Sequence, residues 1–403
     1  MVTDEDLMTS NAARASQLPH VVRVLVVARA VNRLGAFTLP FLALLLTQEH
    51  GWTTAAAGAM LTGFGLAAIP SRLLGGRLAE TRGRRTTMVL GLTGCAVSQL
   101  ALAGATSTAA TVAAVLALGL CFEIYEPPNQ ALIADHVRLE DQPAAHGMMA
   151  AALAGSAVAA GVIATLLAGV DLRWLFVADA ISCLGCALIV LRAVPPDVRG
   201  IPPRGASRAL PRLPAERSPW RDGRLLVLLG VQTCFAVVYL QSTIALPLSL
   251  VERGQQAWTL GVLLVASALT MIAATPVMRR APFRSWTRPT QLRVGYLTLG
   301  AGLAGYAVAG SLPAYVAASA VAAVGDLFLM GVLLTVVAGL APPRGRARYL
   351  AVFGLSWGIA AILAPTIGIA MLSSLGVAAT WGLLAGGCVT LGLLARTYLP
   401  PST

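Results

Sequence analysis

Membrane-length apolar stretches, separated by short segments that carry arginine, constrain this sequence more than any other feature. A membrane-spanning helix needs about 20 mostly apolar residues. The chain has 57% hydrophobic and only 11% charged residues, whereas soluble domains carry about 25% charged residues. The sequence therefore predicts an all-α membrane protein with twelve transmembrane helices, at 21–46, 54–76, 86–106, 109–134, 145–169, 173–194, 224–249, 257–279, 292–311, 313–340, 348–374 and 377–398.

The positions of the arginines determine the predicted orientation of the helices in the membrane. All 29 basic residues are Arg. Five (Arg29, Arg33, Arg72, Arg173 and Arg253) lie within spans or in loops predicted to face outward. The other 24 (29 − 5) fall in or beside the N-terminal tail, alternate loops and the C-terminal end. Positive loops stay on the cytoplasmic side, so both termini are predicted to be cytoplasmic. The net charge of +12 then reflects topology and contacts with anionic lipids. No nucleic-acid partner is expected.

A segment rich in Pro and Arg, from Arg192 to Arg224, cannot span a membrane and divides the helices into two sets. A linker of this composition between two half-sized repeats is typical of secondary transporters. The predicted domains are a cytoplasmic tail (1–19), an N-terminal six-helix bundle (20–194), a cytoplasmic linker (195–223) and a C-terminal six-helix bundle (224–399).

One loop carries a specific motif. Between the second and third spans, residues 76–85 read Gly-Arg-Leu-Ala-Glu-Thr-Arg-Gly-Arg-Arg. This pattern resembles the signature loop of the major facilitator superfamily, the twelve-helix secondary transporters, with Glu80 where that family usually has Asp. The resemblance implies a conformational gate in which Glu80 and Arg84, together with Asp135 at the end of the fourth helix, bind across the two bundles. The gate residues are Gly76, Glu80, Gly83, Arg84, Arg85 and Asp135. The other reading is that the loop only fixes topology.

Charged side chains inside the spans need an explanation, since each costs about 2.5–3.5 kcal/mol to insert. Arg29 and Arg33 share one face of the first helix, and Glu123 and Glu126 share one face of the fourth. Arg29 and Glu126 lie about 12–13 Å, and Arg33 and Glu123 about 18 Å, from the cytoplasmic ends of their helices. The matching depths predict two pairs, Arg29 with Glu126 and Arg33 with Glu123. Such pairs suit a proton-sensitive site, although a permanent pair that fixes packing is the alternative.

Asp326 in the tenth span has no arginine near it in its own or adjacent spans, and it is predicted to carry protons or a cationic solute. The fourth-helix arginine that the family often ties to proton coupling is missing, and Val115 and Leu116 occupy that region. Coupling is therefore expected to rest on Glu123, Glu126 or Asp326. Pro127 and Pro128 should bend the fourth helix at cavity depth.

The substrate cavity is expected to be lined by polar and aromatic groups on helices that face inward in the family. An adaptable surface of amides, aromatics and methionine suits an amphipathic organic solute. The predicted lining comprises Arg29, Arg33, Asn32, Tyr125, Gln232, Tyr239, Gln241, Phe328, Met330 and Trp357, with Gln130 as a further candidate.

These features predict a proton-coupled antiporter that exports a drug or secondary metabolite. The Pro-rich fourth helix ending at Asp135, and residues 33–42 of the first helix, look like the exporter branch. Uptake of a sugar or organic anion is the alternative, because Arg29 and Arg33 suit an anion. A multispan enzyme or sensor is a remote one, since no nucleophile–base motif or metal-ligand cluster is visible. No cofactor is expected. The expected setting is a monomer in a bacterial inner membrane, with a small-molecule substrate, protons and lipids as partners.

Overall fold

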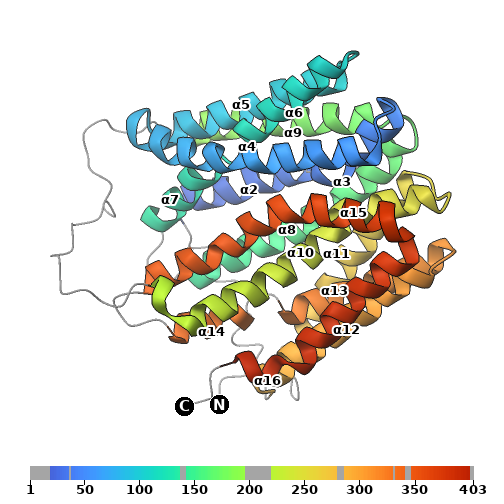
Figure 1. The fold of residues 1–403 in the computed structure, drawn as a ribbon. Helices are drawn as coiled ribbons and strands as arrows, with labels where there is room; N and C mark the ends of the chain where they lie inside the picture. The colour runs from blue at the N-terminus through green and yellow to red at the C-terminus, as the bar shows by residue number, and fades with distance from the viewer. Residues whose placement is uncertain are drawn as a thin grey trace. The chain divides into compact units, whose positions relative to one another are not determined.

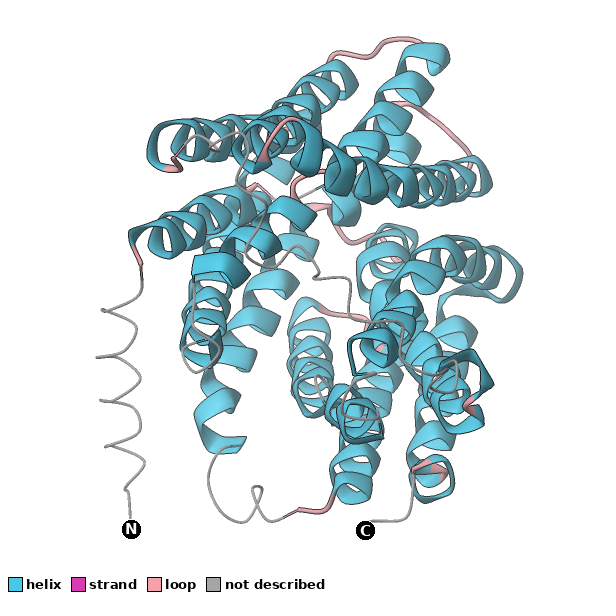
Figure 2. Ribbon diagram, turned by 90° about the vertical axis from the view of Figure 1, so that its left-hand side faces the viewer, coloured by secondary structure: helices cyan, strands magenta, loops and turns pink. Residues whose placement is uncertain are grey.

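The computed structural model describes residues 19–35, 38–136, 142–195, 219–278, 286–329, 332–340 and 346–399. Every regular element in these ranges is a helix (Figures 1 and 2). Nine helical stretches among them are long and apolar enough to cross a membrane. Helices overlap all twelve predicted ranges, but the number twelve and the cytoplasmic placement of both ends stay predictions. The predicted tail and most of the predicted linker lie outside the described residues.

Contacts group the chain into two compact units. Unit 1 takes in residues 1–38, 63–163 and 170–210. Its helices are α2 (His20–Leu34), the second part of α4 (Thr54–Thr81), α5 (Arg84–Ala103), α6 (Thr108–Phe122), α7 (Glu126–His136), most of α8 (Gln142–Ala168) and α9 (Arg173–Ala193). Its core contains Val22, Leu25, Met88, Leu92 and Val190 from α2, α5 and α9, so these three helices pack around one apolar centre.

Unit 2 takes in residues 39–62, 164–169 and 211–403. Its elements include most of α3 (Thr38–Leu44), a π-helical turn (Leu45–Glu49), α10 (Gly223–Glu252), α11 (Trp258–Met278), α12 (Arg288–Val308), α13 (Leu312–Leu329), α14 (Val332–Leu340), α15 (Arg346–Leu393) and α16 (Ala395–Tyr398). A short 3₁₀ turn, Pro219–Arg221, precedes α10. Because residues 39–62 and 164–169 group with this unit, the contact units differ in extent from the predicted bundles, whose boundaries stay predictions.

Helix ends follow local chemistry. Ser107 caps α6 by accepting the Ala110 N–H, and Asp222 caps α10 by accepting the N–H groups of Arg224 and Leu225. Side-chain oxygens at these positions satisfy amides that have no partner inside the helix. Within α15, Gly376 has φ 75° and ψ 174°. Only glycine adopts this conformation readily, so α15 bends there into two arms that match the predicted eleventh and twelfth spans (Figure 1).

Candidate functional site

The fourth predicted span is broken near its middle. Helix α6 ends at Phe122 and α7 begins at Glu126, so residues 123–125 form a turn inside a stretch long and apolar enough to span a membrane. Pro127 and Pro128 occupy the first turn of α7, where the missing N–H groups cost little. The bend predicted from these prolines is confirmed, and it amounts to a full interruption. Irregular backbone at this depth is a feature of transporter sites.

Two glycines on neighbouring helices make room for the break. A Cβ atom added to Gly75 of α4 would lie 2.6 Å from the Ile124 carbonyl oxygen, and one added to Gly91 of α5 would lie 3.0 Å from the Ile124 Cβ. A Cβ at Gly76, the glycine singled out by the sequence motif, would meet no described atom within 4 Å. Close packing on the break therefore depends on Gly75 and Gly91, which the motif does not identify.

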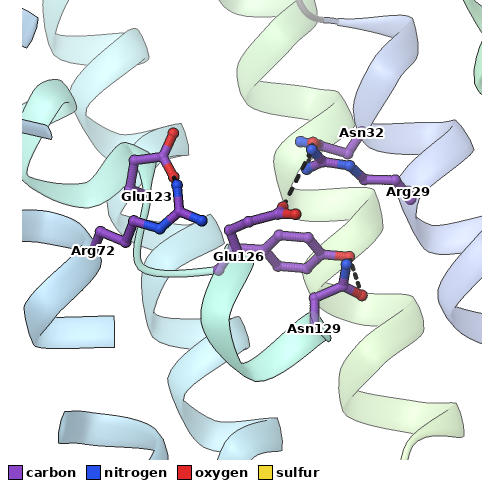
Figure 3. A network of polar contacts seen from close by, with 7 residues as sticks. Arg29, Asn32, Arg72, Glu123, Glu126 and Asn129 are labelled. Atoms are coloured by element: carbon purple, nitrogen blue, oxygen red, sulfur yellow. Dashed lines mark hydrogen bonds and ion pairs between the residues drawn. The ribbon is translucent and has the colours of Figure 1, made fainter. Parts of the chain in front are cut away.

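Arg29 and Glu126 form the predicted ion pair. The Arg29 Nη2 lies 3.3 Å from the Glu126 Oε2 (Figure 3). The guanidinium carbon also lies 5.4 Å from the centre of the Tyr125 ring, and Nη1 donates to the Asn32 Oδ1 at 3.5 Å. The hydroxyl of Tyr125 donates in turn to Asn129 at 3.4 Å. Four predicted site residues, Arg29, Asn32, Tyr125 and Glu126, are thus brought together within unit 1.

Glu123 pairs with Arg72, so the predicted partner, Arg33, is wrong. The Arg72 Nη1 lies 3.7 Å from the Glu123 Oε2 (Figure 3), and the Glu123 backbone N–H donates to the Ser71 hydroxyl at 2.9 Å. The prediction assumed one continuous helix that carries both glutamates on one face. The break ends that periodicity, and Glu123 is held by α4 while Glu126 is held by α2. Arg33 is exposed.

A further carboxyl of unit 1 is linked to the Arg29 side chain through Asn32, although it is not among the predicted site residues. Asp179 of α9 is buried; the Ser182 hydroxyl and the Cys183 thiol approach its Oδ1 at 3.5 and 3.7 Å. Asn32 donates its Nδ2 to the Cys183 sulfur at 3.4 Å, which connects α9 to the Arg29 side chain. The spacing Asp179–Ser182–Cys183 on one helical turn was the available sequence signal.

The signature loop joins α4 to α5. Gly83 has φ 92°, a conformation that explains its glycine. Glu80 is exposed, Arg84 is half-buried, and the Arg85 guanidinium donates to the Leu191 carbonyl near the end of α9. Asp135 lies in α7, but its side chain is outside the part that the structure describes, as are the side chain of Gln130 and all of Met330. The gate stays a prediction.

Asp326 is buried in the core of unit 2. Its exposed fraction is 7%, and its Oδ1 has no hydrogen-bond partner among the described residues. Gly325, the preceding residue, packs so closely on Leu299 of α12 that an added Cβ would overlap the Leu299 backbone. A buried carboxyl with an oxygen that lacks a hydrogen-bond partner is costly when the group is ionised.

The remaining predicted lining residues lie in unit 2. Tyr239 and Trp357 meet edge to face with ring centres 5.4 Å apart, and Phe235 touches both at 6.1–6.4 Å. Phe328 stacks on Trp286 at 5.7 Å. Gln232 and Gln241 are buried, and the Gln241 amide donates to the Ala364 carbonyl at 3.0 Å, just before Pro365 in α15. Of the predicted lining residues of unit 2 whose side chains are described, Trp357 is exposed and Tyr239 is half-buried.

Within the described ranges no group of three His, Cys, Asp or Glu side chains could hold a metal ion, and the six cysteines are free thiols. Apolar helices of spanning length, a broken span and charge pairs at membrane depth together define a multi-span membrane transporter. The sequence model of the Major Facilitator Superfamily matches residues 25–325. The chain belongs to this superfamily, and it is therefore a transporter of small molecules and not an enzyme.

Individual relatives agree with this assignment. The uncharacterized MFS-type transporter YhjO of Bacillus subtilis (strain 168) is 24% identical over 371 residues, which cover 90% of this chain and 89% of that protein. Among solved structures, the peptide transporter POT in complex with sulfate aligns with a TM-score of 0.75 and 15% identity, over 96% of this chain and 97% of its own. The POT family transporter PepTSo aligns with a TM-score of 0.76 and 13% identity, over 94% and 97%. At these identities the likeness concerns the fold.

Proposed function

We propose that the chain is a proton-coupled secondary transporter that exports a small organic molecule, such as a drug or secondary metabolite, by alternating access. The observation that carries this proposal is the break at residues 123–125, where two glutamates are each paired with an arginine from a different helix. A carboxylate held by an arginine can exchange that partner for a proton or for a charged solute, so the site has two electrostatic states.

Asp326 supplies a second proton-binding group in the proposal. It lies in unit 2 and takes part in neither ion pair found among the described residues, so no arginine partner neutralises its charge there. In the proposed cycle, Asp326 or Glu123 takes up a proton as solute leaves and releases it before solute is loaded again. A membrane potential of 100 mV supplies about 2.3 kcal/mol per charge, which corresponds to about fifty-fold accumulation.

The setting of this transporter is proposed as well. We place it in a bacterial inner membrane as a monomer with twelve spans, both termini in the cytoplasm, and lipids around its arginine-bearing loops. Residues 20–194 and 224–399 form the two bundles. Glu80, Arg84 and Asp135 act as the gate, with Gly76, Gly83 and Arg85 shaping the loop.

Uptake is the second candidate function. Arg29 keeps a third of its side chain exposed beside Glu126, so an anionic solute can reach the guanidinium. A solved relative of the same fold is a POT family transporter in complex with 5-aminolevulinic acid, with a TM-score of 0.73 and 14% identity over 95% of this chain and 96% of that chain. A sugar or organic anion driven inward by protons is the form that this alternative takes.

A reconstitution experiment tests both candidates. Purified protein is placed in vesicles with an imposed pH gradient, and a panel of cationic dyes, peptides, sugars and organic anions is followed together with vesicle pH. Export predicts that a solute moves opposite to the protons, and uptake predicts that it moves with them. The variant Glu123→Gln with Asp326→Asn should lose the dependence on the gradient. Solute flux that ignores the gradient in the unmodified protein would rule out proton coupling.

A further inference from the structure

Three contacts join one turn of α4 to the break in the fourth span, all within unit 1. The Ser71 hydroxyl accepts the Glu123 N–H at 2.9 Å, the Arg72 guanidinium lies 3.7 Å from the Glu123 carboxylate, and Gly75 packs on the Ile124 carbonyl. Ser71 is fully buried. The backbone and the side chain of Glu123 are thus both held by adjacent residues of a single helix.

These contacts sit on the helix that leads into the signature loop. Helix α4 runs without interruption from Thr54 to Thr81, and Gly83 then turns the chain into α5. Since an α-helix rises 1.5 Å per residue, Arg72 and Glu80 are about 12 Å apart along one rigid rod. A shift of α4 at Ser71 and Arg72 therefore moves the loop as well.

We propose that Ser71 and Arg72 are positioning residues that link the charge of Glu123 to the position of α4 and the signature loop. The inference rests on the proposed function and adds a route from the protonated group to the loop. With Glu123 ionised, Arg72 is drawn to the carboxylate. With Glu123 protonated, this attraction is lost, and the Ser71 hydrogen bond and the Gly75 contact remain as the pivot about which α4 shifts.

Other titratable groups lie near Glu123, and a test of the proposed link must separate their effects from that of Arg72. Glu126 of α7 and Arg29 of α2 interact with it electrostatically, as does the Cys95 thiol of α5. Arg29 is already paired with Glu126, whereas Arg72 is the cation within ion-pair distance of Glu123 in the described residues. Changes at Arg72 therefore test the proposed link with the Arg29 pair left in place.

The experiment follows α4 directly and needs no transported solute. A bimane fluorophore is attached to Arg77→Cys in a Cys234→Ala background, which removes the one exposed native thiol among the described cysteines. The labelled protein in lipid nanodiscs is titrated with acid through the range in which carboxylic acids bind protons. We expect one step in bimane emission, and we expect Glu123→Gln to abolish it. A label at Thr106→Cys, in the loop between α5 and α6, should show no step.

Variants of the contact residues decide the outcome. Arg72→Gln should remove most of the step, Arg72→Lys should keep it, and Ser71→Ala should reduce its amplitude at least about twofold. Arg23→Gln removes an exposed arginine of the same unit and should leave the step unchanged. A full step in both Arg72→Gln and Ser71→Ala would overturn the inference. If Arg72→Gln fails to fold, Ser71→Ala compared with Ser71→Thr decides in its place.

Failure of the inference is distinct from failure of the proposed function. If the pH gradient drives solute flux in vesicles but the bimane step does not depend on Arg72 and Ser71, proton coupling is supported and this route is excluded. If the bimane step depends on Arg72 and Ser71 but solute flux does not depend on the pH gradient, the route is supported and proton coupling is excluded.

Discussion

The guanidinium of Arg29 lies between a carboxylate and an aromatic face, 3.3 Å from Glu126 and 5.4 Å from the centre of the Tyr125 ring. The ring face carries partial negative charge, so Tyr125 can hold the cation when the carboxylate is neutral. This arrangement is compatible with the proposed pair that opens and closes and also with a permanent pair that fixes packing.

Reversing the pair separates these two roles. Glu126→Gln leaves Arg29 without its counter-charge and should lower the transport rate at least about tenfold, a loss of about 1.4 kcal/mol. The exchanged variant, Arg29→Glu with Glu126→Arg, rebuilds a salt bridge but puts the carboxylate on α2, away from the break. We expect it to recover thermal stability in detergent but not pH-dependent flux. Recovery of both would identify a packing pair.

The sequence carried enough information for the helical class, the bend at Pro127 and the pair of Arg29 with Glu126, because each depends on composition, local chemistry or depth along a helix. The sequence did not allow the partner of Glu123 to be predicted. Helical periodicity holds only while the helix continues, and the break turns Glu123 toward Arg72. The contacts of Gly75 and Gly91 with Ile124 were also out of reach, since they depend on how three helices approach one another.

Two adjacent glycines of α4 offer a matched test of that packing. Gly75→Ala places a methyl group against the Ile124 carbonyl, 2.6 Å away, and overpacking of this kind costs about 1–3 kcal/mol. Gly76→Ala meets no described atom within 4 Å and gains about 1 kcal/mol of helix propensity. Thermal unfolding in detergent should therefore show a lower midpoint for Gly75→Ala and an unchanged or higher one for Gly76→Ala. Equal midpoints would contradict the close contact.

Trp357 and Tyr239 form an accessible aromatic pair in unit 2, with ring centres 5.4 Å apart. An amphipathic solute that stacks on this pair gains about 1.4 kcal/mol, or tenfold in affinity. Trp357→Ala should raise the KM of the transported solute about tenfold with little change in maximal rate, and Trp357→Phe should raise it less. Trp220→Ala removes an exposed tryptophan outside the spans and serves as the control. An unchanged KM in Trp357→Ala would exclude stacking on Trp357.

Asp326 and Asp222 provide a pair of aspartates with opposite environments in one unit. Asp222 caps α10 and accepts a hydrogen bond from the Tyr349 hydroxyl at 3.0 Å, whereas the Asp326 Oδ1 has no such partner among the described residues. Asparagine caps helices about as well as aspartate, so Asp222→Asn should keep both stability and coupling. Asp326→Asn keeps the side-chain volume and removes the proton-binding group.

The expected result for Asp326→Asn is a loss of gradient-driven flux with solute exchange retained. Exchange of labelled for unlabelled solute requires binding and alternating access but no net proton movement, so a coupling residue is dispensable for it. Vesicles loaded with unlabelled solute should take up label at a rate similar to the unmodified protein, while an imposed pH gradient should no longer concentrate it. Loss of both activities would mean that Asp326 serves binding or folding, and retention of both would leave coupling to Glu123 and Glu126.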